Sequence, residues 1–321
     1  MQDTHDYQID RVRLLACFGV VMLHSSYGKG AADLALNAIF RFSVPVFVII
    51  SGYFIQLPLR FSNIRNKVSR LFCRMLLCSG VYLLYALMRG GSMPESPILY
   101  LLTEPIHLWY LYATMGLYLL SPALAPFVRS AEPKEYRYAL LVCFLLGSCI
   151  VTLIRLDLFP LVQTILDKSK LPDMLCFTGL YLLGGYFRRF GFSHRRRWFT
   201  AGALMTAFSI AASATPYAGQ LLSFFSPNVV ISGCACFVLC MTLPEVPAQF
   251  RRPLSAAAKC TMGVYLFHPM ICELITPYLL IPTHIWGGGP AMLLRCICTF
   301  VLTLAVIWLL HPIPPLKKWL L

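Results

Sequence analysis

The sequence has few charged residues. Asp, Glu, Lys and Arg make up only 12% of the 321 residues, and hydrophobic residues make up 58%. A soluble domain has about 25% charged and about 45–50% apolar residues. A chain this apolar cannot bury its hydrophobic surface in one water-soluble core. The composition therefore excludes an ordinary soluble domain and predicts a protein that has lipid as its solvent.

Acidic residues are especially scarce. The sequence has 13 Asp and Glu against 27 Lys and Arg, which gives a formal net charge of +14. The cations lie in short segments between apolar runs and do not form one basic face, so nucleic-acid binding is not predicted. The excess is typical of membrane topology, because cytoplasmic loops collect Lys and Arg.

Paired C-x-x-C motifs are also missing, although the sequence has 13 cysteines. Structural zinc sites need such pairs, so no metal is predicted. The first dozen residues lack the pattern of a cleavable signal peptide, and we expect the first span to be its own insertion signal. Neither an internal repeat nor a low-complexity linker is visible. Residues 1–321 are therefore predicted to form one domain.

Long apolar runs are abundant, and short polar segments separate them. They predict an all-α, polytopic bundle of about ten transmembrane helices. Most Lys and Arg residues fall in alternate loops on the side that also holds both termini, which predicts cytoplasmic termini. The predicted spans are residues 12–28, 36–57, 72–88, 107–128, 138–155, 172–188, 198–214, 220–242, 257–279 and 291–311.

Two ionisable residues frame the first predicted span, and such groups are functional candidates because they are costly in a membrane. Arg13 lies at its start and His24 near its far end. At ~100° and ~1.5 Å per residue, they share one helix face and lie ~16 Å apart along the axis. Arg can hold phosphates, and His can take a proton from a hydroxyl. The structural alternative is that Arg13 marks the inner end of the span and His24 caps its outer end.

A basic segment follows the second predicted span. Residues 60–74 carry five cations, and they are predicted to form an amphipathic helix. Lys67, Arg70 and Arg74 have the spacing i, i+3 and i+7, which places them on one helix face. That face could hold a polyphosphate ligand, or it could bind anionic lipids.

Other polar residues lie within or next to the predicted spans. The alternatives to function are an interfacial Arg, an aromatic belt and a hydrogen-bonded core histidine. Arg155 and Asp157 are predicted to form a structural pair at the end of the fifth span. The candidates for substrate binding are Arg41, Ser51, His107, Trp109, Tyr265 and His268.

Four segments, taken in order, resemble the acyltransferase-3 family of integral membrane acyltransferases. They are Arg13-x10-His24, Arg41-Phe-Ser-Val-Pro-Val-Phe-Val-Ile-Ile-Ser-Gly-Tyr53, His107-Leu-Trp-Tyr-Leu111 and Gly263-Val-Tyr-Leu-Phe-His268. Each is short, but their order and coverage of nearly the whole chain make the resemblance specific. Within the family, the chain is similar to single-domain members of the type that O-acetylates the enterobacterial common antigen.

The resemblance implies an enzyme of the cell (plasma or inner) membrane. The donor would be cytoplasmic acyl-CoA, with acetyl-CoA as the default. The acceptor would be a hydroxyl of a surface glycan or of an undecaprenyl-linked sugar precursor. His24 would be the catalytic base and Arg13 would support the donor, while Lys67, Arg70 and Arg74 would bind donor phosphates. Membrane lipids are the other expected partners, and neither a metal nor a nucleic acid is implied.

Two other classes of function remain open from the residues alone. Buried His and Arg could serve a transporter or flippase of a lipid-linked glycan, although no inverted repeat is obvious in the sequence. A membrane sensor or non-catalytic partner of another glycan enzyme would bind no CoA at all.

Overall fold

The structure is a computed structural model of the chain. It describes residues 6–26, 30–55, 61–103, 105–156, 171–277 and 288–310. All regular secondary structure in these residues is helical, so the all-α prediction is confirmed for this part of the chain. Asp157, the predicted partner of Arg155, lies outside the described residues.

The described residues form a series of helices, and short turns join most of them. In chain order these are α1 (Tyr7–Leu23), α2 (Ala31–Phe40), α3 (Ser43–Tyr53), α4 (Phe61–Met88), α5 (Pro97–Thr103), the 3₁₀ turn η1 (Ile106–Leu108), α6 (Trp109–Ser130), α7 (Pro133–Phe144), the π-helical segment η2 (Leu145–Cys149), α8 (Ile150–Arg155), α10 (Leu171–Phe190), α11 (Arg195–Ser213), α12 (Ala218–Leu221), α13 (Pro227–Met241), α14 (Ala248–Lys259), α15 (Thr261–Ile275) and α17 (Gly288–Leu310).

Several of these helices can cross a membrane. Five stretches of the described residues are long and apolar enough, namely Ala31–Tyr53, Phe61–Met88, Trp109–Ser130, Pro133–Arg155 and Gly288–Leu310. The chain is thus a multi-pass membrane protein. The larger number of about ten spans and the cytoplasmic position of both termini stay predictions.

Several element boundaries differ from those predicted. Helix α1 begins at Tyr7, so Arg13 lies within the helix and not at its start. The basic segment and the third predicted span form one 28-residue helix, α4, because neither proline nor glycine interrupts residues 61–79. The second predicted span is instead divided at Arg41 and Phe42 into α2 and α3. Pro45 lies in the first turn of α3, where its missing N–H is tolerated but where it cannot continue a preceding helix.

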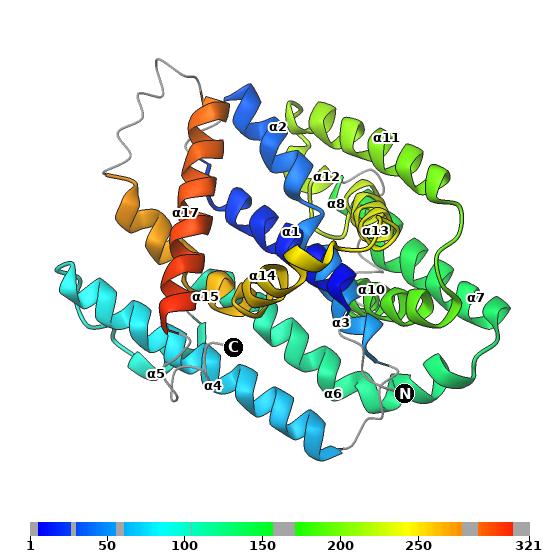
Figure 1. Ribbon diagram of the computed structural model, residues 1–321, viewed down its shortest axis with the longest axis horizontal. Coiled ribbons are helices and arrows are strands. Elements are labelled where there is room, and N and C mark those ends of the chain that lie inside the picture. The colour runs from blue at the N-terminus through cyan, green and yellow to red at the C-terminus, as the bar shows by residue number, and fades with distance from the viewer. Residues whose placement is uncertain are drawn as a thin grey trace.

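Helix α1 lies in the middle of the bundle (Figure 1). It packs against α2, α3, α13, α14, α15 and α17. Helix α4 follows one edge of the molecule and packs against α5, α6 and α15, whereas α7 and α11 lie on the far side of α1 from α4. Because α1 is central, residues at its two ends contact different parts of the bundle.

Helices α3 and α10 approach each other through glycines. A Cβ atom at Gly52 would lie 1.8 Å from the carbonyl oxygen of Tyr181, and one at Gly184 would lie 2.1 Å from that of Ile49. Neither position can therefore hold a larger residue without separation of the two backbones. Small residues at helix contacts are the usual means of close packing in membranes, where burial from water does not drive association.

We expect Gly184→Ala to destabilise the protein by about 1–3 kcal/mol, the usual cost of overpacking. Gly80→Ala is the matched control, because nothing among the described residues lies within 4 Å of a Cβ atom there. Thermal unfolding in detergent, followed by loss of monodisperse protein, would measure both. Equal midpoints for the two variants would show that the α3–α10 contact tolerates a methyl group.

Candidate functional site

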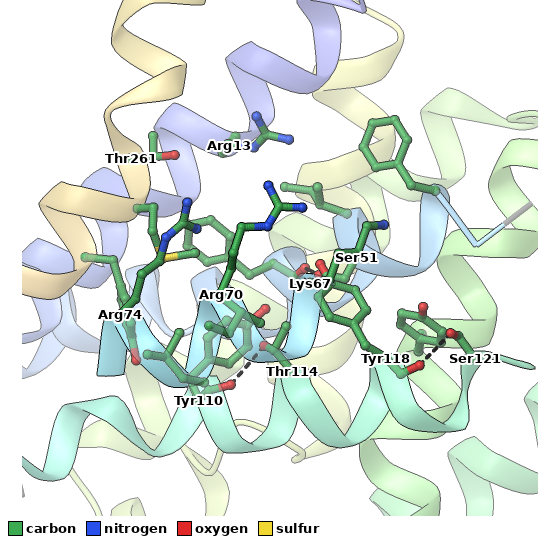
Figure 2. A pocket seen from close by; sticks show the side chains of 18 of the residues that line it. Arg13, Ser51, Lys67, Arg70, Arg74, Tyr110, Thr114, Tyr118, Ser121 and Thr261 are labelled. Carbon is green, nitrogen blue, oxygen red and sulfur yellow. Dashed lines mark hydrogen bonds between the residues drawn. The ribbon is translucent and has the colours of Figure 1, made fainter. Parts of the chain in front are cut away.

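A large cavity lies between α1, α3, α4, α6 and α15 (Figure 2). Its volume is about 960 Å³, at the upper end of the range of about 300–1,000 Å³ that is usual for small-molecule sites. Its size suits a ligand larger than a single sugar or amino acid.

The walls of this cavity are strongly basic. No Asp or Glu of the described residues lines it, and the guanidinium groups of Arg13, Arg70 and Arg74 extend into the same space (Figure 2). The like charges of these groups repel one another, so they need water or an anionic ligand between them. The cationic lining residues are Arg13 of α1, Lys67, Arg70 and Arg74 of α4, and Lys259 at the end of α14.

Local contacts orient these cations. A guanidinium nitrogen of Arg13 lies 3.7 Å from the carboxylate of Asp10, which is buried below it. Lys67 Nζ lies 5.2 Å from the centre of the Tyr118 ring, and Arg70 Nε donates to the carbonyl oxygen of Asn66 at 2.9 Å. Arg74 Nε is buried without a hydrogen-bond partner in the described structure. A buried donor of this kind needs a partner, and an anion in the cavity would supply one.

Helix α6 contributes a polar stripe to the same cavity. Tyr110, Thr114, Tyr118 and Ser121 all line it. Their spacing of four, four and three residues places them on one helix face, and this signal was available in the sequence but not used. Lys259 was also missed, because it is distant in sequence and only the turn between α14 and α15 brings it to the cavity.

A second, much smaller cavity lies at the C-terminal end of α1. Its volume is about 40 Å³, enough for a few water molecules. His24, the C-cap residue of α1, is exposed and lines this cavity. The cavity is lined by Val20, Leu23, His24, Val44, Phe47, His107, Trp109, Tyr110, Phe224 and Tyr265.

Three histidines from separate parts of the chain meet here. The ring centre of His24 lies 5.0 Å from that of His268 and 6.4 Å from that of His107. The rings of His107 and His268 are 5.8 Å apart. No group of three His, Cys, Asp or Glu side chains within the described ranges has the geometry to hold a metal ion. The three imidazoles thus lie close to one another, and two of them, His24 and His107, line the cavity.

Two of the three imidazoles are fixed by α15. His107 Nε2 lies 3.1 Å from the carbonyl oxygen of Leu266, and His268 Nδ1 lies 2.9 Å from that of Tyr265. In the neutral form each of these nitrogens carries the proton and donates it. Within the described part of the chain, neither nitrogen of the His24 ring has such a partner. His268 Nε2 also lacks a hydrogen-bond partner in the described structure, but it is buried, whereas His24 is exposed and lines the small cavity. His24 is therefore the more accessible of these two imidazoles to a ligand.

Aromatic side chains and one arginine lie beside the small cavity. Trp109 stacks on Phe224 with ring centres 5.8 Å apart and stays 37% exposed. Arg41 lies between α2 and α3. Its guanidinium carbon is 5.2 Å from the centre of the Phe224 ring. Together they offer a flat apolar surface next to a positive charge.

The structure distributes the residues predicted from sequence between these two places. Arg13, Ser51, Lys67, Arg70 and Arg74 line the large cavity. The hydroxyl of Ser51, a candidate for substrate binding, donates to the Phe47 carbonyl oxygen at 3.0 Å. His107 and Trp109 line only the small cavity, and Tyr265 lines both cavities. His268 lines neither but contacts His24, and Arg41 contacts Phe224. The residues around His24 are His107, Trp109, Tyr265, His268 and, through Phe224, Arg41.

Comparison with known proteins identifies the family of the chain. The family described as an acyltransferase domain, acyltransferase-3, matches residues 6–311. No protein of curated function and no solved structure matches the chain. The narrower resemblance to the enterobacterial common antigen type stays a prediction. Because the match covers nearly all of the described helices, the chain belongs to the acyltransferase-3 family of membrane acyltransferases.

Proposed function

We propose that the protein transfers an acyl group from acyl-CoA to a hydroxyl of a cell-surface glycan or of its lipid-linked precursor. The observation that supports this most is the pairing of two adjacent cavities. One is large and basic, the other small and lined by His24, and three of their lining residues are the same. Transfer between two substrates needs this kind of shared boundary.

Acyl-CoA suits the large cavity in charge and in shape. CoA carries several phosphate groups at one end and its thioester at the end of a long flexible arm. Phosphates can bind Arg13, Arg70 and Arg74 through charge-assisted hydrogen bonds. Arg13 lies near the middle of helix α1 and His24 is its C-cap residue, ~16 Å further along the axis. A thioester reaching from the basic cavity can therefore approach His24.

The chemical step follows from the free imidazole of His24. The hydroxyl oxygen of the acceptor attacks the thioester carbonyl carbon while His24 takes the hydroxyl proton. The tetrahedral intermediate then collapses, the C–S bond breaks, and the CoA thiolate leaves. The thiolate takes this proton from the imidazolium. The products are an ester and free CoA, and His24 is neutral again.

The acceptor would enter past Trp109, Phe224 and Arg41. A sugar ring can lie against the exposed face of Trp109, because aromatic rings offer large apolar contact. Arg41 can bind an anionic group, such as a phosphate of a lipid-linked sugar. This proposal assigns the donor side to the basic cavity and the acceptor side to the aromatic one, in the cell membrane.

We expect His24→Asn to lower the rate of transfer by about 10²–10⁴-fold, the usual contribution of a positioned general base. His194→Asn is the matched control. His194 has a φ of 59°, precedes α11 and lines neither cavity, and Asn tolerates that backbone conformation. Release of free CoA from acetyl-CoA, by protein in nanodiscs with a crude glycan-lipid extract, would measure both.

The extract also separates the competing functions. CoA release that needs the extract and is lost only in His24→Asn supports the proposal. Transfer by folded His24→Asn at the wild-type rate would show that His24 takes no part in the reaction. Movement of a lipid-linked glycan across vesicles without any acyl donor, together with no CoA release, would favour a transporter instead.

We expect Arg74→Gln to weaken CoA binding by about 10–150-fold, because a hydrogen bond to a charged group contributes about 1.5–3 kcal/mol. Titration calorimetry with CoA in nanodiscs would measure the dissociation constant, which should also rise with salt. Arg196→Gln is the control, since Arg196 is exposed on α11 and outside the cavity. Equal loss of affinity in both variants would mean that only the overall charge attracts CoA.

A further inference from the structure

Three aromatic rings separate the basic cavity from the histidine cavity. Phe47 of α3, Tyr110 of α6 and Tyr265 of α15 are the residues that line both. The ring centres of Phe47 and Tyr110 lie 6.1 Å apart, and those of Tyr110 and Tyr265 lie 6.0 Å apart. The rings thus form a continuous row, which we call the ring row, with Tyr110 in the middle.

Each ring is held by a different helix, so the row is part of the packed bundle. The Tyr265 hydroxyl donates to the backbone carbonyl oxygen of His107 at 2.5 Å. Phe47 packs against the clusters around α1 and α10. Packed interiors lose contacts when a ring shifts, so the row cannot move aside without cost.

The space beyond the ring row is small, and part of its wall is aliphatic. Its volume is about 40 Å³, against about 960 Å³ on the basic side. Val20, Leu23 and Val44 give it aliphatic walls next to His24. Such a space can take the methyl group of an acetyl thioester. A longer acyl chain would have to displace a ring, and inserting extra methylenes into a packed interior is costly.

We propose that Phe47, Tyr110 and Tyr265 set the length of the acyl group, so that acetyl-CoA is the donor and longer straight-chain acyl-CoAs are rejected. This inference rests on the proposed function. The phosphates and arm of CoA are the same for every acyl chain, so the basic cavity cannot discriminate among them. Discrimination among acyl-CoA donors must come from the site that holds the acyl group. The ring row forms one boundary of that site.

The test compares acetyl-, propionyl- and butyryl-CoA as donors for the full-length protein in nanodiscs with the glycan-lipid extract. A pocket discriminates by about 10–200-fold for each methylene. We therefore expect kcat/KM of the wild type to fall at least tenfold for each added carbon. Phe47→Ala should raise the ratio of butyryl to acetyl kcat/KM by about tenfold or more.

Phe300→Ala is the matched control, because Phe300 is a half-buried ring on α17 that contacts Phe18 and lines neither cavity. Its butyryl-to-acetyl ratio should equal that of the wild type. Phe47→Leu removes less volume and should give an intermediate ratio, which keeps the test valid if Phe47→Ala does not fold.

The outcomes separate this inference from the proposed function. A wild type that uses butyryl-CoA as well as acetyl-CoA, or an unchanged ratio in both Phe47 variants, overturns the role of the ring row and leaves the acyltransferase intact. A folded wild type that releases CoA from none of the donors overturns the proposed function, and the inference with it.

Discussion

Electrostatic repulsion among five cations governs the design of the site. Arg13, Lys67, Arg70, Arg74 and Lys259 line one cavity without an acidic partner among the lining residues described. Charges within a bundle of apolar helices are costly, and the carboxylate of Asp10 offsets only the charge of Arg13. The bundle can hold them only by keeping a space of about 960 Å³ between them, which water or an anionic ligand fills. An anionic ligand in the cavity would relieve their repulsion.

Helix α1 connects that charge cluster to the imidazole of His24. Asp10 orients Arg13 near the middle of the helix, and the C-cap position exposes His24 at its end. Because α1 is surrounded by six other helices, neither end can move independently of the bundle. A donor bound through its phosphates would therefore meet His24 at a fixed distance, and fixed distance is what makes a group transfer efficient.

Close backbone contacts give the bundle its rigidity. Gly52 and Gly184 bring α3 against α10, and α3 carries both Ser51 of the basic cavity and Phe47 of the ring row. In lipid, helices gain little from hydrophobic burial, so packing contacts decide where each helix sits. The position of the ring row thus depends on glycines that lie outside both cavities.

The sequence by itself determined the membrane class, the helical fold and most of the charged site. Composition and the i, i+3, i+7 spacing on α4 are local properties, and so is the separation of Arg13 from His24 along one helix. Spacing on α6 could also have indicated Thr114 and Tyr118. Only the tertiary structure decided that Lys259 joins the cations, that Ser51 lies in the basic cavity, and that His24, His107 and His268 meet. It alone placed Phe47, Tyr110 and Tyr265 between the two cavities. These contacts join helices far apart in the chain, and their geometry depends on helix packing, which periodicity within one segment does not encode.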